Sequence, residues 1–208
     1  MRVTKDPKER RNEILDTAEW LFTTKGYTKT TINDILQEIG IAKGTFYYYF
    51  KSKEEVMDAI IMRLTGMYVS KAKEIAARTD LNANEKLLQI FMGNRQDEKK
   101  EQMIEQLHEV ENAQMHQKSL VETILQMTPV LTGILEQGIN EGVYKTLYPR
   151  EVVEFLLVSS NFLFDEGIFK WKPQEIQQKG NAFVWITATL LGTDKDNVSF
   201  FANLFDQS

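Results

Sequence analysis

Cysteine is absent from this chain of 208 residues, and histidine occurs only twice. The absence of cysteine excludes disulfides, thiolate chemistry and cysteine-ligated metal centres, and it is typical of a reducing compartment. No segment approaches the ~20 consecutive apolar residues that a membrane-spanning helix needs. The charged start MRVTKDPKERR has no apolar signal-peptide centre behind it. We therefore expect a cytoplasmic protein without a membrane partner.

The short motifs of common enzyme classes are also missing. The chain has no GxGxxG, P-loop, GxSxG or HExxH pattern, and helix capping explains acidic pairs such as Glu54-Glu55. His108 and His116 lie near acidic residues, but they do not form a compact HxxxH pair, so surface histidines are favoured over metal ligands. We expect a protein that is not an enzyme and that holds no cofactor or metal.

The composition is that of a globular protein, with 42% hydrophobic and 26% charged residues. Charge is divided unevenly along the chain. Residues 1 to 53 carry ten lysines and arginines against seven aspartates and glutamates, a net charge of +3, whereas the remainder has a net charge of −8. Only the first quarter of the chain is therefore expected to attract a polyanion.

Capping signals predict two helices in the first 40 residues. Asp6 followed by Pro7 starts a helix of about five turns, and Gly26 ends it. Thr31 caps a second, shorter helix that ends at Gly40. Only two residues separate Gly40 from the next helix, so the two helices must cross steeply and share a core. The expected shared core is Ile35, Ile39, Ile41, Phe46 and Phe50.

The rest of the chain is also predicted to be helical, because alternating strand patterns are missing. A capping box at Ser52 and Glu55 opens a long helix whose apolar stripe includes Met67. Asn82 or Asn84 opens the next helix, and an exposed loop is expected at residues 93–102. Further helices are expected at about 102–117, 119–141, 149–168, 174–191 and 198–204. Pro129 should kink or divide the second of these.

The segments EVVEFLLVSSNFLF and AFVWITATLL are apolar on nearly every side. A helix of this kind must be covered on all sides, either by a second subunit or by the monomer's own bundle. Both alternatives are open from the sequence alone. The fold class is all-α.

Three consecutive tyrosines occur in the stretch AKGTFYYYFKSKEE, between Lys43 and Lys51. In a helix these rings cannot all face the core, because each residue turns by about 100°. An exposed tyrosine offers an apolar ring with a hydroxyl at its tip, which suits a partner that mixes apolar groups with anionic oxygens. Duplex DNA is such a partner, and two short helices joined by a glycine-containing turn describe a helix-turn-helix.

Two stretches, TTINDI at residues 30–35 and GIAKGTFYYYFKSKEE at 40–55, resemble the signature of the TetR family of bacterial transcriptional regulators. The strong resemblance covers roughly residues 8 to 60. It implies an N-terminal three-helix helix-turn-helix domain at residues 1–53 and a helical-bundle domain for ligand binding and dimerisation at 54–208. It also implies a repressor that binds a palindromic double-stranded DNA operator as a homodimer and is released by a small-molecule effector.

The resemblance assigns DNA contacts to eight residues. Positions matching base edges and neighbouring phosphates are Lys43, Gly44, Thr45 and Tyr48, and Asn33 can reach a base from the second helix. Tyr47, Tyr49 and Lys53 match phosphate-contacting positions. Two residues depart from the family pattern: Leu36 replaces a small residue, and Ala42 replaces the serine that would cap the third helix, a loss of about 1 kcal/mol of local stability.

The resemblance also places a ligand in the C-terminal part. Candidate lining residues are Met103, Leu107, Glu111, Met115, Phe162 and Trp171, although core packing is the favoured interpretation for each of them. A different class of function stays open, namely a helical protein-interaction module without sequence-specific DNA binding. The retained Lys43, Thr45 and Lys53 favour the regulator.

Overall fold

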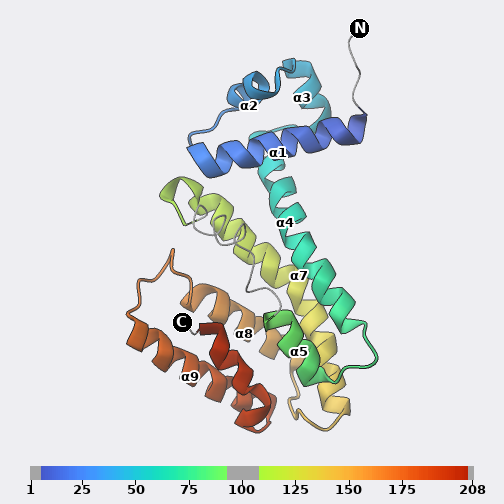
Figure 1. Cartoon of the computed structure of the whole chain (residues 1–208), viewed down its shortest axis with the longest axis vertical. Helices are drawn as coiled ribbons and strands as arrows, with labels where there is room; N and C mark the ends of the chain where they lie inside the picture. Colours follow the sequence, from blue (N-terminus) through green and yellow to red (C-terminus); the bar gives the residue numbers. More distant parts are fainter. Residues whose placement is uncertain (1–5, 93–107, 206–208) are drawn as a thin grey trace. The chain divides into compact units, whose positions relative to one another are not determined.

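The computed structural model describes residues 6–92 and 108–205, which are helical and contain no strand. The exposed loop expected at residues 93–102 lies outside the described ranges, as do the candidate ligand residues Met103 and Leu107. The helices are labelled in Figure 1. Their bounds are α1 Pro7–Lys25, α2 Ile32–Ile39, α3 Lys43–Tyr49, α4 Lys53–Ala76, α5 Ala83–Met92, η1 Val110–Asn112, α7 Ala113–Asn140, α8 Pro149–Leu163, α9 Pro173–Leu191 and η2 Lys195–Phe205. The predicted all-α fold class is confirmed.

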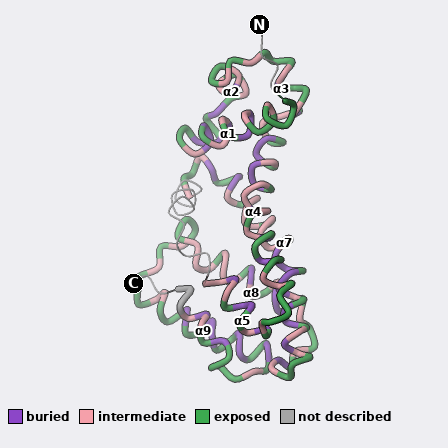
Figure 2. Tube along the Cα trace, turned by 45° about the vertical axis from the view of Figure 1, so that its right-hand side comes forward, coloured by how far each residue is buried: buried purple, intermediate pink, exposed green. Residues whose placement is uncertain are grey.

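The chain divides into two compact units. The first unit comprises residues 1–65 and 99–119, and the second comprises residues 66–98 and 120–208. The expected boundary after residue 53 falls within the first unit, because the first half of α4 belongs to that unit's core. Val56, Met57 and Ile60 of α4 are fully buried there. Figure 2 shows buried positions along the trace in both units.

Helix ends in the first unit follow the predicted capping signals. The Asp6 carboxylate accepts a hydrogen bond from the Lys8 amide at the start of α1, and α1 ends at Gly26. Thr31 and Asp34 form a reciprocal capping box at the start of α2. The Ser52 hydroxyl accepts a hydrogen bond from the Glu55 amide at the start of α4. These local bonds satisfy amide groups that a helix start leaves without partners.

Buried apolar residues of α1, α2, α3 and α4 form the core of the first unit. The predicted shared core is confirmed: Ile35, Phe46 and Phe50 are buried, while Ile39 and Ile41 pack against them. The segment after residue 107 adds a further member, because Met115 of α7 is buried in the same cluster. Met115 is among the candidate ligand-lining residues, and its burial here agrees with the alternative of core packing.

Helix α7 changes the expected helix boundaries and, of the kink or division expected at Pro129, excludes the division. It runs from Ala113 to Asn140 without division at Pro129, so residues 113–118 belong to this helix and not to a separate one before it. A proline removes one backbone hydrogen bond. Burial of Met127, Val130 and Leu131 on either side of Pro129 holds the helix together.

Helices α5, α8 and α9 and the later part of α7 surround the core of the second unit. Asn82 caps α5, since its side chain accepts a hydrogen bond of 2.9 Å from the Glu85 amide. Gly142, with φ of +78°, ends α7, and the amides of Val143 and Tyr144 then donate to the Gly138 carbonyl. Tyr144 is buried against Gly138.

Two helices of the second unit expose large apolar side chains. Those on α8 are Phe155, Val158 and Phe162, and those on α9 are Trp185, Ile186 and Leu190. The opposite sides of the same helices enter the unit's own core through residues such as Val153 and Phe183. Met67, expected on the buried stripe of α4, is 60% exposed. Across residues 6–92 and 108–205, no helix has both the length and the hydropathy needed to span a membrane.

Candidate nucleic-acid interface

The turn between α2 and α3 depends on Gly40. This residue adopts the left-handed conformation, with φ of +73°, which glycine enters without the steric cost of a Cβ. Its amide and that of Ile41 both donate to the Leu36 carbonyl, at 2.9 and 3.1 Å. The Leu36 side chain is half-buried against the core, so the first unit accommodates this departure from the family pattern.

Helix α3 presents two of its three tyrosines to solvent. Tyr48 is 78% exposed and Tyr47 is 44% exposed, whereas Tyr49 is half-buried and packs against the core. Phe46 and Phe50 hold the opposite face in the core, with ring centroids 6.1 Å apart. The spacing of these aromatics along α3 therefore points Tyr47 and Tyr48 away from the unit.

Tyr47 and Tyr48 are each braced by a neighbouring side chain. The Tyr48 and Tyr49 rings meet edge to face at 4.9 Å, and the Lys43 ammonium lies 5.8 Å from the Tyr47 ring centroid. Such contacts limit the motion of an exposed aromatic and reduce the entropy lost when it binds. Both exposed rings of α3 therefore contact another side chain of the same helix.

Lys43 and Gly44 are exposed at the start of α3, and Thr45 is half-buried. Ala42 provides no side-chain cap, as its sequence predicts. Gly44 has no packing role: apart from its chain neighbours and its own helix backbone, no described atom lies within 4 Å of the place where a Cβ would stand. Glycine lowers helix stability at such a position, so its presence points to close approach by another molecule.

Asn33 is exposed in the first turn of α2, beside the capping box of Thr31 and Asp34. The Lys25 ammonium donates to the Asp34 carboxylate at 2.7 Å, and the Thr31 amide donates to the same oxygen at 2.7 Å. These bonds lower the pKa of Asp34 from 3.8 to about 2, and the hydrogen bond from Lys25 has the largest effect. The start of α2 is thus fixed, and Asn33 projects from a rigid turn.

Lys53 has contacts that its sequence position did not predict. Its ammonium donates to the Tyr27 carbonyl at 2.8 Å and to the Thr30 carbonyl at 2.9 Å. It also lies 4.2 Å from the centroid of the Tyr27 ring. The pKa of Tyr27 is raised to about 12, mainly by burial and to a smaller extent by the nearby charge of Glu54. Lys53 therefore holds the connection between α1 and α2, a role distinct from the phosphate contact implied by the resemblance.

The same connection is bound by the turn that precedes α7. The Glu111 carbonyl accepts hydrogen bonds from the Thr28 amide at 3.1 Å and the Thr28 hydroxyl at 2.7 Å. The Glu111 carboxylate pairs with Lys29 at 2.6 Å, which lowers the pKa of Glu111. Glu111 was expected to line a ligand site, and in the structure it stabilises the helix-turn-helix unit.

Sequence reasoning missed Arg11 near α3. Its guanidinium carbon lies 5.0 Å from the centroid of the Phe50 ring, at the end of α3, and the residue is exposed. A basic residue on α1 gives no local signal that it will reach a helix more than 30 positions away. Arg11 and Lys51 are both exposed, and both add positive charge to the first unit near the end of α3.

Two further candidate ligand residues, Phe162 and Trp171, both contact Phe169. Trp171 stacks on Phe169 at 5.0 Å, and its indole donates to the Leu163 carbonyl. Phe162 meets Phe169 edge to face at 5.8 Å. Phe162 and Trp171 thus belong to an aromatic cluster formed by the end of α8 and the segment that follows it. His108 and His116 are half-buried, with ring centroids 5.1 Å apart.

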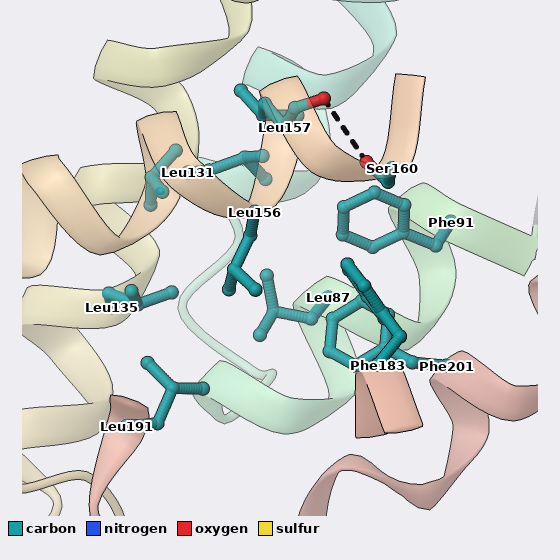
Figure 3. A pocket seen from close by; sticks show the side chains of 11 residues that line it. Leu87, Phe91, Leu131, Leu135, Leu156, Leu157, Ser160, Phe183, Leu191 and Phe201 are labelled. Carbon is teal, nitrogen blue, oxygen red and sulfur yellow. Dashed lines mark hydrogen bonds between the residues drawn. The ribbon is translucent and has the colours of Figure 1, made fainter. Parts of the chain in front are cut away.

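The second unit contains an apolar cavity of about 40 Å³. Its lining residues are Leu87, Phe91, Leu131, Leu135, Val153, Leu156, Leu157, Ser160, Phe183, Leu191 and Phe201. Figure 3 shows Leu87 and Leu156 between Leu131 and Leu135 on one side and the three phenylalanines on the other. In the sequence these residues have the spacing of ordinary core positions, so no local pattern distinguishes them.

Both the N-terminal and the C-terminal part of the chain match known protein families. Residues 14–60 match the family described as bacterial regulatory proteins, tetR family, and residues 95–186 match a tetracyclin repressor-like C-terminal domain. YhgD of Bacillus subtilis (strain 168), described as an uncharacterized HTH-type transcriptional regulator, is 30% identical over 170 residues, covering 80% of this chain and 86% of YhgD.

Similarity extends over nearly the full length of two other proteins. The HTH-type transcriptional repressor KstR2 of Mycobacterium tuberculosis (strain ATCC 25618 / H37Rv) is 25% identical over 201 residues, covering 95% of this chain and 99% of KstR2. A crystal structure of a gamma-butyrolactone receptor (ArpA like protein) shares the fold, with a TM-score of 0.59 at 16% identity, covering 97% of this chain and 98% of that one.

The buried aromatic seam of α3, its exposed tyrosines and the tight turn at Gly40 define a helix-turn-helix DNA-binding protein. The chain belongs to the TetR family of bacterial transcriptional regulators. It is a DNA-binding transcriptional regulator, and the relatives it matches are regulators as well.

Proposed function

We propose that this regulator is a repressor that binds a palindromic operator as a homodimer and that a small molecule releases it. The single observation that carries the DNA contact is the exposure of Tyr47 and Tyr48 beside Lys43 and Gly44 on a helix whose other face is locked into the core. Similarity to the transcriptional repressor KstR2 supports repression, and similarity in fold to a gamma-butyrolactone receptor supports a small-molecule effector.

The residues of this surface divide into two kinds of DNA contact. Tyr48, as the most exposed ring, meets bases and thymine methyl groups together with Thr45 and Gly44, and Asn33 reaches a base from α2. Lys43, Tyr47 and Tyr49 contact phosphates on either side, and Arg11 and Lys51 add charge. Lys53 supports the surface by holding the connection between α1 and α2.

A dimer is needed because one recognition helix buries too little surface for tight, specific binding. Two such helices about 34 Å apart read successive major grooves of a palindrome. The exposed apolar side chains on α8 and α9 are the surface through which two copies associate. Phe155, Val158 and Phe162 repeat at positions i, i+3 and i+7, which aligns them along one face of α8.

The DNA-contact proposal is tested by comparing Tyr48→Ala with Tyr148→Ala. Both tyrosines are well exposed, at 78% and 65%, but Tyr148 lies in the second unit. Operator fragments are first selected from mixed genomic DNA, and binding is then measured by fluorescence anisotropy on operator and random duplexes at two salt concentrations. Tyr48→Ala should lose about 1–3 kcal/mol on the operator and less on random DNA. Tyr148→Ala should bind as wild type.

Equal losses on operator and random DNA for Tyr48→Ala would refute base contact by this residue. An absence of fragment selection together with a flat salt dependence would favour a protein-interaction module instead.

Dimerisation is tested by sedimentation of Phe155→Glu against Leu147→Glu, since Leu147 is 86% exposed and lies before α8. Only Phe155→Glu should produce monomers. Dimers of Phe155→Glu at micromolar concentration would exclude α8 as the interface.

A further inference from the structure

The cavity of the second unit is apolar on every described side. Ten of its lining residues are hydrophobic, and the other is Ser160. The Ser160 hydroxyl donates to the Leu157 carbonyl at 3.3 Å within its own helix, as the dashed line in Figure 3 shows. Its oxygen keeps the capacity to accept one hydrogen bond from a bound molecule.

No titratable side chain is among the residues of the described chain that line this cavity. Lys86 is the neighbour of Leu87 on α5 and is itself buried, but its ammonium donates to the Ala76 carbonyl and the Gln137 side-chain oxygen, both at 2.7 Å. A charged ligand group would therefore lose its water without gaining an ionic partner in the cavity.

The cavity is much smaller than a typical small-molecule site of about 300–1,000 Å³. A ligand must therefore separate the walls, and walls made of side chains such as Leu156 and Phe91 close again when the ligand leaves. Flexible hydrocarbon groups can enter such a site in steps, because each methylene that enters exchanges contact with water for contact with the walls.

We propose that this cavity is a binding site for an uncharged, mostly hydrocarbon molecule with at most one hydrogen-bonding group, which lies near Ser160. The effector role of that molecule depends on the function proposed above, whereas its binding does not. The cavity could influence the first unit through α7. Leu131 and Leu135 of the cavity lie on this helix, and Met115 of the same helix belongs to the core of the first unit.

Three probes with the same chain and different head groups test this proposal: 1-octanol, octanoate and octylammonium at pH 7.4. Binding to the full chain is measured without DNA, by displacement of the neutral fluorophore N-phenyl-1-naphthylamine and by thermal shift. Octanol should bind saturably and at least about tenfold more tightly than either ion, because only the ions lose hydration without compensation. Equal binding of octanoate or octylammonium overturns the proposal.

Variants at position 160 locate the site. Ser160→Leu fills the cavity and should abolish octanol binding, while Ser160→Ala should preserve it. The matched control is Ser159→Leu, which adds the same side chain on the same helix at a position that does not line the cavity. If Ser160→Leu does not fold by circular dichroism, the smaller Ser160→Val replaces it. Unchanged octanol binding by the filled variant identifies the cavity as a packing void only and overturns the proposal.

Photolabelling with 3-azioctanol, followed by peptide mapping, gives a second readout. Labels on residues of the lining set, which come from α5, α7, α8, α9 and η2, support the site, and labels elsewhere contradict it. DNA release by octanol is measured separately on the selected operator. Saturable octanol binding without any DNA binding would leave the ligand class intact and reject the proposed function. DNA binding without octanol binding would leave the proposed function intact and reject the ligand class.

Discussion

The backbone amide of Tyr27 donates a hydrogen bond of 2.7 Å to the side-chain carbonyl of Asn112, which lies 85 positions later in the chain. Both residues are buried, at 3% and 2% exposure. With Glu111 bonded to Thr28, this contact makes the turn before α7 a structural part of the helix-turn-helix unit.

Asn112→Ala should therefore lower the free energy of unfolding of the protein by about 1–3 kcal/mol, because the Tyr27 amide is left buried without its acceptor. Urea unfolding followed by circular dichroism measures the change. Asn181→Ala on the exposed face of α9 is the control and should have little effect. A stability loss no larger than that of the control would show that the contact does not hold the unit together.

Gly44→Ala should separate stability from DNA binding. The added Cβ meets no described atom within 4 Å, so the helix should gain up to about 1 kcal/mol of stability. If Gly44 contacts DNA as proposed, the same methyl group should weaken operator binding. Gly133→Ala in α7 also meets open space, and it should stabilise the protein without changing affinity. Operator affinity equal to wild type in Gly44→Ala would remove the case for close DNA approach at this residue.

Gly138→Ala should destabilise the second unit. A Cβ at this position would overlap the ring of Tyr144 at Cδ2. That ring is buried, and the backbone amide of Tyr144 is bonded to the Gly138 carbonyl. Overpacking of this kind typically costs about 1–3 kcal/mol. Thermal unfolding measures the loss, with Gly133→Ala on the same helix as control.

A double-mutant cycle with Tyr144→Leu tests the cause. Removing the ring should make Gly138→Ala less harmful, so the two changes should couple favourably. Additive losses would place the origin of the destabilisation elsewhere than in the Tyr144 ring.

Asp34 should contribute to stability above its unfolded pKa and lose that contribution in acid. Its pKa is lowered to about 2, chiefly by the hydrogen bond from Lys25, against about 3.9 in an unfolded chain. A depressed folded pKa stabilises the protein above the unfolded value, and the contribution falls as pH decreases from about 4 to 2. The urea midpoints of wild type and Asp34→Asn should therefore differ most above pH 5 and converge toward pH 2. Asn33→Ala is the control and should keep the wild-type pH dependence. A difference in urea midpoint between wild type and Asp34→Asn that does not change with pH would reject a lowered pKa for Asp34.

Lys53→Ala distinguishes a structural role from a phosphate contact. Loss of the hydrogen bonds to the Tyr27 and Thr30 carbonyls should lower the free energy of unfolding by about 1–3 kcal/mol. A residue that contacted only phosphate would leave stability unchanged and reduce the slope of binding against salt by about one. Unfolding curves and salt titrations on the same preparation measure both quantities. Lys51→Ala, at an exposed position two residues earlier, should alter only the salt dependence.

Signals that act within a few residues predicted much of the fold. Thr31 with Asp34, Ser52 with Glu55 and the left-handed Gly40 form the caps and the turn that their sequence implies. The burial of Phe46 and Phe50 follows from their spacing of four on one helix face. These features could be read from the sequence because each depends on neighbours along the same turn or helix.

Partners that lie far away in the chain could not be read from the sequence. The resemblance implied ligand contacts for Glu111 and Met115, and only the fold shows that Glu111 bonds to Thr28 and that Met115 joins the core of the first unit. The phosphate contact implied for Lys53 stays a prediction, and no local pattern indicates that its ammonium donates to the carbonyls of Tyr27 and Thr30.

The sequence by itself determined the helical class, the helix-turn-helix and the exposure of part of the tyrosine run, since capping bonds and helical periodicity are short-range. Tertiary structure alone decided that residues 109–115 complete the first unit and that apolar residues from α5, α7, α8, α9 and η2 enclose a cavity in the second. The physical reason is that burial in a common core depends on which helix faces meet, and periodicity identifies an apolar face without naming the face that covers it.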